Sequence, residues 1–511
     1  MRMPGCIEWN VKLHGKKVAV AGVVLCLATV ASAVMVIPNL FPFLDPTGVM
    51  STYNTNGAIV ENTPFFQSLG TNGRSCASCH VVGNAMGLSV QNVQERFQLT
   101  RGHDPLFAAV DGANCPNTSS NDPSTHSLLL KSGVFRIGIA LPLQTQFTIR
   151  AVVDPYGCAV TTDPTTGVRT VSVYRRPLPT TNLKFLSAVM FDGRETIMPL
   201  NNLNTFQANL LTDLKHQAMD ATTGHAQAAE PPTDAQQSAI AEFEMGLLSG
   251  QLADNRAGML TDHGALGGAR NVAATNYDPG INDPLGADPT GAAFNPNAFT
   301  LFFSWEDSKT ENEREQGFET AREDIAAGET IFNSRPVTIT NVRGLNDNPT
   351  LAAELGTTVP IASFQGTCTT CHNTPNVGNH SVALPLDIGT GHDAAQERDT
   401  QIANGLAQLS VPRVPVYEIT GCPNPFAAAE QNSAPYVIYT TDPGKGLLTG
   451  QCSDVNRIKG PILRGLAARA PYFHNGAAQD LTEVVNFYNQ RFQMNLTDQE
   501  KRQLIAFLNS L

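Results

Sequence analysis

The sequence predicts a mainly α-helical fold built from two helical domains, the first of which carries a small inserted β-sheet. Three observations support this prediction. One five-residue motif, Cys-x-x-Cys-His, occurs twice, once in each half of the 511 residues. Apolar residues near the C-terminus recur with the spacing of an α-helix. The first half contains short runs rich in β-branched residues and bounded by Pro, Gly and Asp, which is typical of strands.

The two copies of the motif indicate covalently bound haem. They are Cys76-Ala-Ser-Cys79-His80 and Cys368-Thr-Thr-Cys371-His372. In this motif each thiol adds to one vinyl group of a haem, and the histidine that follows binds the iron. A zinc site would need four ligands where one motif offers three, and a redox pair would need a βαβ pattern that neither motif shows. We therefore expect two haem c groups, with His80 and His372 as iron ligands, in two domains like cytochrome c.

The motifs divide the chain into an N-terminal haem domain, residues 45–310, and a C-terminal haem domain, residues 318–511. The stretch 276–297 is rich in Gly, Asn and Pro and predicts a long surface loop. Charged, helical sequence is expected after it, over 305–325.

Local signals place several elements. Thr497-Asp498-Gln499-Glu500 is a capping box that predicts the start of the last helix. Two groups of residues share one apolar helical face each: Leu481, Val484, Val485 and Tyr488, then Leu504, Phe507, Leu508 and Leu511. The strand-like runs cover residues 134–141, 146–153 and 170–174, which we interpret as one small sheet inserted in the first domain.

The N-terminus, residues 1–33, reads as an export signal. Three lysines precede an uncharged run, 18–37, and Ala31-Ser32-Ala33 is a small-residue cleavage site. The alternative is an uncleaved membrane anchor, because the run is long enough to span a bilayer. Either way the protein is expected in the periplasm, an oxidising compartment.

Four further cysteines, Cys115, Cys158, Cys422 and Cys452, predict two disulfides in such a compartment. Three pairings are open, and the local one, Cys115–Cys158 with Cys422–Cys452, keeps each bridge within one half. The net charge of −12 argues against a nucleic-acid partner, whose phosphates require a basic surface. It permits a basic protein as electron donor.

Three segments beyond the motifs carry a family resemblance. They are Phe191-Asp192-Gly193-Arg194, the run Lys459-Gly460-Pro461-Ile462-Leu463-Arg464, and Pro471-Tyr472-Phe473-His474-Asn475-Gly476. Together with the haem motifs, in this order over most of residues 65–511, they resemble the bacterial di-haem cytochrome c peroxidases and the related MauG-type enzymes.

The resemblance implies a division of labour. Hydrogen peroxide would react at the N-terminal haem, held by His80, and electrons would enter through the C-terminal haem, held by His372. It implies a small cytochrome c or copper protein as donor, and carries over a calcium ion bound partly by main-chain carbonyls near the Pro471–Gly476 segment. The oligomeric state stays open, with a homodimer as one alternative.

The chain also departs from the family pattern. Phe191 stands where the peroxidases have a Trp, and no equivalent of their catalytic Glu is obvious in the stretch 215–227. His225 is our first candidate for the acid/base and His216 the second; the alternative for each is a surface or core-capping histidine.

The sixth iron ligand of the C-terminal haem has two candidates. Tyr488 lies fourteen residues after His474, where MauG-type enzymes have a Tyr and the peroxidases a Met. It could equally be a packed core tyrosine. Met494, just before the last helix, is the rival ligand.

The leading hypothesis is a di-haem oxidoreductase that reduces hydrogen peroxide. One alternative is a MauG-type enzyme that oxidises aromatic side chains of a partner protein. The other is a non-catalytic carrier in which both haems have six ligands.

Overall fold

The computed structural model describes residues 34–116, 118, 121–306, 316–340, 342–424 and 436–511. The predicted export signal, residues 1–33, lies outside this range. Among the described residues no helix is both long and apolar enough to cross a membrane.

The prediction of a mainly α-helical fold with two cytochrome c-like helical domains is wrong. The described part of the chain is 31% helical and 15% strand, with several small sheets, which is an ordinary mixed composition. Two features explain the difference. Helical periodicity is confined to a few segments, and each Cys-x-x-Cys-His motif lies on a single 3₁₀ turn rather than a long helix. The 42 glycines and 33 prolines interrupt the chain elsewhere.

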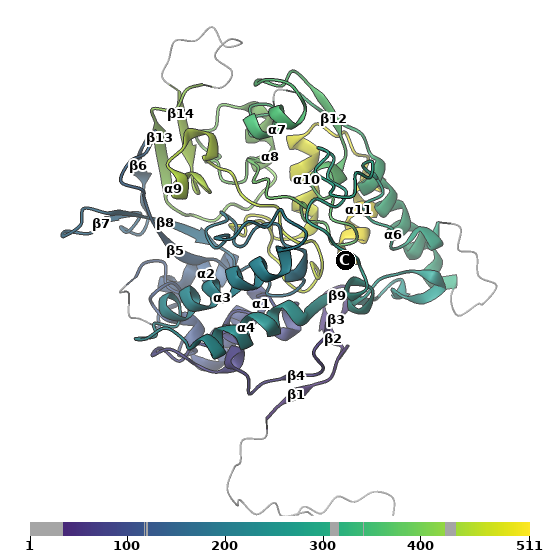
Figure 1. The fold of residues 1–511 in the computed structure, drawn as a ribbon, viewed down its shortest axis with the longest axis horizontal. Helices are drawn as coiled ribbons and strands as arrows, with labels where there is room; N and C mark the ends of the chain where they lie inside the picture. The colour runs from purple at the N-terminus through teal and green to yellow at the C-terminus, as the bar shows by residue number, and fades with distance from the viewer. Residues whose placement is uncertain (1–33, 117, 119–120, 307–315, 341, 425–435) are drawn as a thin grey trace, which may run out of the picture.

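The helices are short except for α3 and α6. They are α1 (Val90–Thr100), α2 (Ser127–Ser132), α3 (Phe206–Gly224), α4 (Asp234–Gly246), α5 (Ala269–Ala273), α6 (Gln316–Ser334), α7 (Pro349–Glu354), α8 (Thr400–Leu406), α9 (Gly446–Thr449), α10 (Leu481–Arg491) and α11 (Asp498–Asn509). In Figure 1, α1–α4 lie on one side of the molecule, and α7, α8, α10 and α11 on the other.

The strands are β1 (Val36–Ile37), β2 (Phe43–Asp45), β3 (Gly48–Asn54), β4 (Ile59–Val60), β5 (Phe135–Ala140), β6 (Thr148–Val153), β7 (Val160–Thr162), β8 (Arg169–Arg175), β9 (Leu247–Asp254), β10 (Gly258–Met259), β11 (Val337–Ile339), β12 (Phe364–Gly366), β13 (Val416–Thr420) and β14 (Val437–Thr440). Within the described ranges they form five antiparallel sheets, in the orders β1-β4, β10-β9-β3-β2, β11-β12, β14-β13-β6 and β5-β8-β7.

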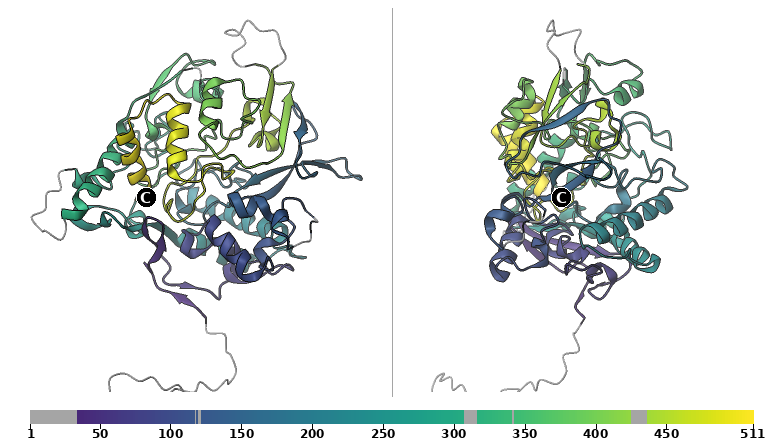
Figure 2. Two further views of the ribbon diagram at one scale, coloured as in Figure 1. Left: turned by 180° about the vertical axis from the view of Figure 1, so that it is seen from behind. Right: turned by 90° about the vertical axis from the view of Figure 1, so that its left-hand side faces the viewer.

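The three predicted strands exist, as β5, β6 and β8, but they do not form one sheet. β6 pairs with β13 from the other half of the chain, with Ile149 opposite Ile419. The inner faces of this sheet and of the β5-β8-β7 sheet share one core, in which Val171, Tyr417 and Ile419 are fully buried. The two halves are therefore joined by backbone pairing at this edge of the molecule (Figures 1 and 2).

The disulfides follow the local pairing. Cys115 and Cys158 are joined, with Cα atoms 6.0 Å apart, and Cys422 and Cys452 are joined, with Cα atoms 5.4 Å apart. Each bridge lies beside one of the two sheets that share a core.

The C-terminal helices are confirmed. The Thr497 hydroxyl accepts from the Glu500 backbone N–H, which closes the capping box of α11. The α11 helix packs on α6, where Gly328 allows close approach: a Cβ there would lie 2.0 Å from the carbonyl oxygen of Gln503. Phe507 is fully buried at this crossing against Phe332.

Arg175, at the end of β8, forms the central ion pair between the halves. Its guanidinium donates to Asp192, in the loop between β8 and α3, and to both carboxylate oxygens of Asp442, in the loop after β14, at 2.6 and 2.8 Å. All three side chains are at most 3% exposed. Burial alone would raise the pKa of Asp442, but the Arg175 charge holds it below its usual value.

A second buried network lies beside β14. His392 is 1% exposed and donates from Nε2 to Asp387, at 2.8 Å, and from Nδ1 to Glu397. Burial alone would lower the pKa of His392, but the two carboxylates outweigh it and raise the pKa to about 9. The histidine is therefore a buried cation at neutral pH.

We expect His392 to make the protein less stable in alkali. Because its folded pKa lies above the unfolded value of about 6.5, its contribution is complete below that pH and is lost as the pH rises through about 9. That contribution is roughly 3 kcal/mol. The thermal midpoint of unfolding between pH 6 and 10 measures it. The fall of the thermal midpoint with rising pH should be smaller in His392→Gln and unchanged in the control His103→Gln, whose side chain is exposed. An equal fall in His392→Gln and in the unchanged protein would contradict the assignment.

Candidate haem-binding cavities

The two Cys-x-x-Cys-His motifs share one local structure. In the first, the backbone N–H of Ser75 donates to Ser78 Oγ at 3.0 Å, and the His80 N–H donates to the Cys76 carbonyl at 3.0 Å. In the second, Thr367 N–H donates to Thr370 Oγ1 at 2.9 Å, and the turn closes in the same way. A hydroxyl residue before the first cysteine and another three positions later therefore cap each 3₁₀ turn.

Both motif histidines are oriented by a carbonyl six residues further on. His80 Nδ1 donates to the Met86 carbonyl at 3.3 Å, and His372 Nδ1 donates to the Gly378 carbonyl at 2.6 Å. This leaves Nε2 of each ring for a metal. Burial lowers the pKa of both histidines, that of His80 to about 4, so both rings are neutral, as a metal ligand must be.

The four motif cysteines are not joined to one another. Burial raises the pKa of every thiol, to about 11 for Cys79 and Cys371 and about 12 for Cys368.

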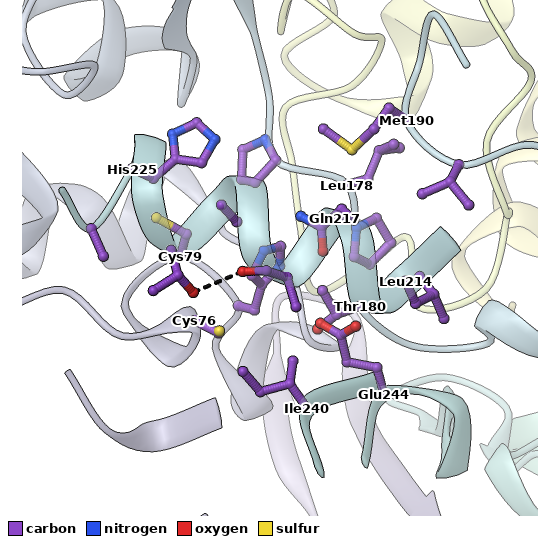
Figure 3. A pocket seen from close by; sticks show the side chains of 18 of the residues that line it. Cys76, Cys79, Leu178, Thr180, Met190, Leu214, Gln217, His225, Ile240 and Glu244 are labelled. Atoms are coloured by element: carbon purple, nitrogen blue, oxygen red, sulfur yellow. Dashed lines mark hydrogen bonds between the residues drawn. The ribbon is translucent and has the colours of Figure 1, made fainter. Parts of the chain in front are cut away.

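Cavity 1 is the space beside the first motif, about 1340 Å³ counted out to its mouth. One face of α3 lines it, through Leu214, Gln217, Ala218, Ala221, Thr222 and His225. Ile240 and Glu244 project from α4 on another side, and Cys76 and Cys79 from the motif (Figure 3). Each wall therefore comes from a different part of the first half.

His225 lies at the end of α3, in cavity 1. Its Nδ1 donates to Asp111, which also accepts from Arg74. Burial alone would raise the pKa of Asp111, but the hydrogen bond from His225 and the Arg74 charge hold it below its usual value. The carboxylate is thus ionised and fixes the imidazole, leaving Nε2 of His225 for proton exchange.

His216, the second candidate, does not line cavity 1. Its Nδ1 donates to Glu195 at 2.8 Å, which raises the pKa of the imidazole. Helix geometry separates the two candidates: nine residues turn through about 900°, which places His216 and His225 on opposite faces of α3. The nine-residue spacing in the sequence was therefore enough to predict that the two histidines could not both face the same cavity.

Glu244 is a site residue that the sequence analysis did not single out. It is 3% exposed, and its Oε2 has no hydrogen-bond partner among the described residues. Burial raises the pKa of this carboxyl to about 8, so it is mostly neutral at pH 7. Glu244 is recognised as a site residue only because it lies three turns into α4, which faces cavity 1. No motif or spacing in the sequence around it indicated this role.

Cavity 2 is the space beside the second motif, about 1810 Å³ counted out to its mouth. Both candidate sixth ligands, Tyr488 and Met494, line it with Cys368, Cys371 and His372. The Tyr488 ring stacks on Phe492 at a centroid distance of 5.9 Å, and burial raises the pKa of its hydroxyl. His380, also buried in this cavity, was not singled out; its Nδ1 interacts with the Val382 carbonyl at 3.1 Å.

A shared wall separates the cavities. Residues 176–179 and Phe191 line both of them. Phe191 packs edge-on against His474, with ring centroids 6.1 Å apart, and its carbonyl accepts from the Lys459 backbone N–H at 2.7 Å. All three resemblance segments therefore border cavity 2.

The residues fit a covalently bound haem at both places. Each cavity brings two thiols and one imidazole with a bare Nε2 to a largely apolar space, which is the donor set that haem c requires. The resemblance carries over a calcium ion bound partly by main-chain carbonyls near the Pro471–Gly476 segment. One carbonyl near this segment, that of Arg469, already accepts a hydrogen bond from the Arg176 guanidinium at 2.9 Å. Calcium stays a prediction.

Comparison with known proteins gives distant relatives. No family model matches the chain. Cytochrome-c peroxidase IdrP2 of Denitromonas iodatirespirans is 30% identical over 158 residues, which are 30% of this chain and 37% of the relative. The protein of the same name from Pseudomonas sp. (strain SCT) is 26% identical over 210 residues, 37% of this chain and 50% of the relative. Cytochrome-c peroxidase IdrP1 of Denitromonas iodatirespirans is 25% identical over 176 residues, 32% of this chain and 42% of the relative. The chain thus spans at most half the length of these relatives, and its likeness is to cytochrome-c peroxidases.

Proposed function

We propose that this chain is an exported di-haem c-type oxidoreductase that reduces hydrogen peroxide, with electrons entering through the C-terminal haem. The observation that carries the proposal is the matched pair of cavities, each lined by both thiols and the imidazole of one Cys-x-x-Cys-His motif. The likeness to cytochrome-c peroxidases supports the same reaction class. The periplasm is the proposed compartment, because the N-terminal residues have the pattern of an export signal.

Cavity 1 is the proposed peroxide site. When bound there, the haem would supply an iron that accepts a peroxide oxygen and delivers electrons to it. Cys76 and Cys79 would hold the group covalently, and His80 would face it with Nε2, because Nδ1 is engaged by the Met86 carbonyl.

His225 is the proposed acid/base of that cavity. Reduction of one peroxide to two waters consumes two electrons and two protons, so a proton must move between the two oxygens. Nε2 of His225 can accept a proton from one oxygen and return it to the other, because Asp111 holds Nδ1 and stabilises the imidazolium while the proton is bound. Asp111 acts through His225 and is a positioning residue.

Cavity 2 is the proposed entry point for electrons. Cys368, Cys371 and His372 would hold the second haem, and the wall of residues 176–179 with Phe191 lies between the two sites. The proposed donor is a small basic cytochrome c or copper protein, because the chain carries a net charge of −12.

Two observations favour a second function. Tyr488 lines cavity 2, and Phe191 stands where the resemblance leads one to expect a Trp. A tyrosine ligand would favour ferric iron and suit MauG-type oxidation of aromatic side chains in a partner protein. A carrier without catalysis is the third alternative, and one five-coordinate, high-spin haem would exclude it.

The first prediction is two covalent haems with unequal roles. The intact mass should exceed that of the polypeptide by two haems, which acid–acetone should not extract. Replacing His80 should abolish peroxide turnover and spare the spectrum of the C-terminal haem, whereas replacing His372 should impair electron entry. Loss of the same spectral signal in both variants would contradict the division of roles.

The second prediction separates the two histidines of α3. His225→Ala should lower kcat/KM for hydrogen peroxide by roughly 10²- to 10⁴-fold, because general acid–base catalysis contributes about that much. Asp111→Asn should lower it less. His216→Ala is the matched control: it lies on the other face of α3, so steady-state turnover should hardly change. An equal loss in His216→Ala would show that cavity 1 does not contain the acid/base.

The third prediction concerns the sixth ligand in cavity 2. Tyr488→Phe should raise the reduction potential of the C-terminal haem and change its ferric spectrum, because a phenolate stabilises ferric iron. Met494→Leu should do little. A methionine–iron charge-transfer band that disappears in Met494→Leu would instead assign Met494 and favour the plain peroxidase.

A further inference from the structure

Cavity 2 has an unusual charge balance. Among the residues that the structure describes, three cationic side chains line it, Arg176, Lys459 and Arg469, and no carboxylate does. Arg176 is 8% exposed and Lys459 is 7% exposed. A buried cation without a partner is expensive, because it has lost its water and gained no opposite charge.

None of the three forms an ion pair with any residue that the structure describes. The Arg176 guanidinium donates to the carbonyls of Leu88, Ser132 and Arg469, and Arg469 donates to the carbonyls of Ile462 and Arg464. Lys459 Nζ donates no hydrogen bond to any of the described residues. Burial lowers the pKa of Lys459 to about 8, and burial with the neighbouring arginine lowers that of Arg176 to about 9.

Cavity 1 shows the contrast. Its other arginines are all matched by acids: Arg74 pairs with Asp111, and Arg175 and Arg194 both pair with Asp192. Arg176 lines both cavities and has no acid partner, whereas the other arginines of cavity 1 each have one; Lys459 and Arg469, which line cavity 2 alone, have none among the described residues. An occupant of cavity 2 with anionic groups would supply the opposite charge that these three side chains lack.

We propose that Lys459, together with Arg469 and Arg176, binds the propionate carboxylates of the haem in cavity 2. The inference rests on the proposed haem at Cys368 and Cys371. Haem carries two propionates, which match a cationic, acid-free cavity wall. Of the three, Lys459 is the one whose charged group donates no hydrogen bond to the described residues. Replacing it therefore tests the assignment without breaking other contacts.

The cations have a consequence for the iron. Ionised propionates stabilise ferric iron by their negative charge, and a bound ammonium group offsets that charge. Lys459 therefore favours the ferrous state and keeps the reduction potential of the C-terminal haem high.

The test compares Lys459→Met, Lys459→Arg and Lys445→Met in the full-length holoprotein. Lys445 is the matched control, because it lies outside cavity 2 and its Nζ is 3.7 Å from Asp454. Haem content is measured first. The readouts are then the potential of the low-spin haem by spectroelectrochemistry and its propionate bending band by resonance Raman spectroscopy, each with and without added chloride.

With two haems bound, Lys459→Met should lower the reduction equilibrium constant about tenfold, close to 59 mV for one electron. It should also shift the propionate band. Lys459→Arg should restore both, and Lys445→Met should change neither. An unchanged band and potential in Lys459→Met would overturn the propionate site and leave the proposed function standing. Shifts that depend on chloride would also overturn it, by assigning the cations to a solution anion. A protein without haem would overturn the proposed function itself.

Discussion

The fold depends on the buried guanidinium of Arg175. It ties β8 of the first half to the loop of Asp192 and to the loop of Asp442 in the second half. Removing one partner of such a pair typically costs about 3–5 kcal/mol, because the remaining charge stays buried. Asp192 directly follows Phe191, whose carbonyl receives the Lys459 N–H. The wall between the cavities is therefore positioned by an ion pair of which only Arg175 lines a cavity, cavity 1.

Local sequence signals predicted local structure well. The capping box at Thr497, the apolar faces of α10 and α11, and the strand-like runs of β5, β6 and β8 all correspond to elements of the structure. Each of these signals is complete within a dozen residues, because caps and periodicity act between near neighbours along the chain. The sequence left three disulfide pairings open, and the structure contains the local one of the three.

Non-local features could not be predicted in this way. Nothing in residues 146–153 specifies β13 as a partner, because any extended run with alternating side chains offers the same backbone hydrogen bonds. The mainly helical expectation failed because it extended the C-terminal periodicity to segments that have none. At the candidate site, the motif residues were evident from spacing, whereas Glu244 and the cations of cavity 2 became visible only when distant segments were brought around one space.

The pairing of β6 with β13 bears on how the chain matures. The Arg150 and Glu418 side chains that face each other across it are 268 positions apart. During synthesis, β6 is complete long before β13 exists, and until then its edge presents unpaired backbone groups that invite association with other chains. The sheet that contains β6 is therefore completed only when the last quarter of the polypeptide supplies β13, so the N-terminal half depends on the far end of the chain to cover this edge.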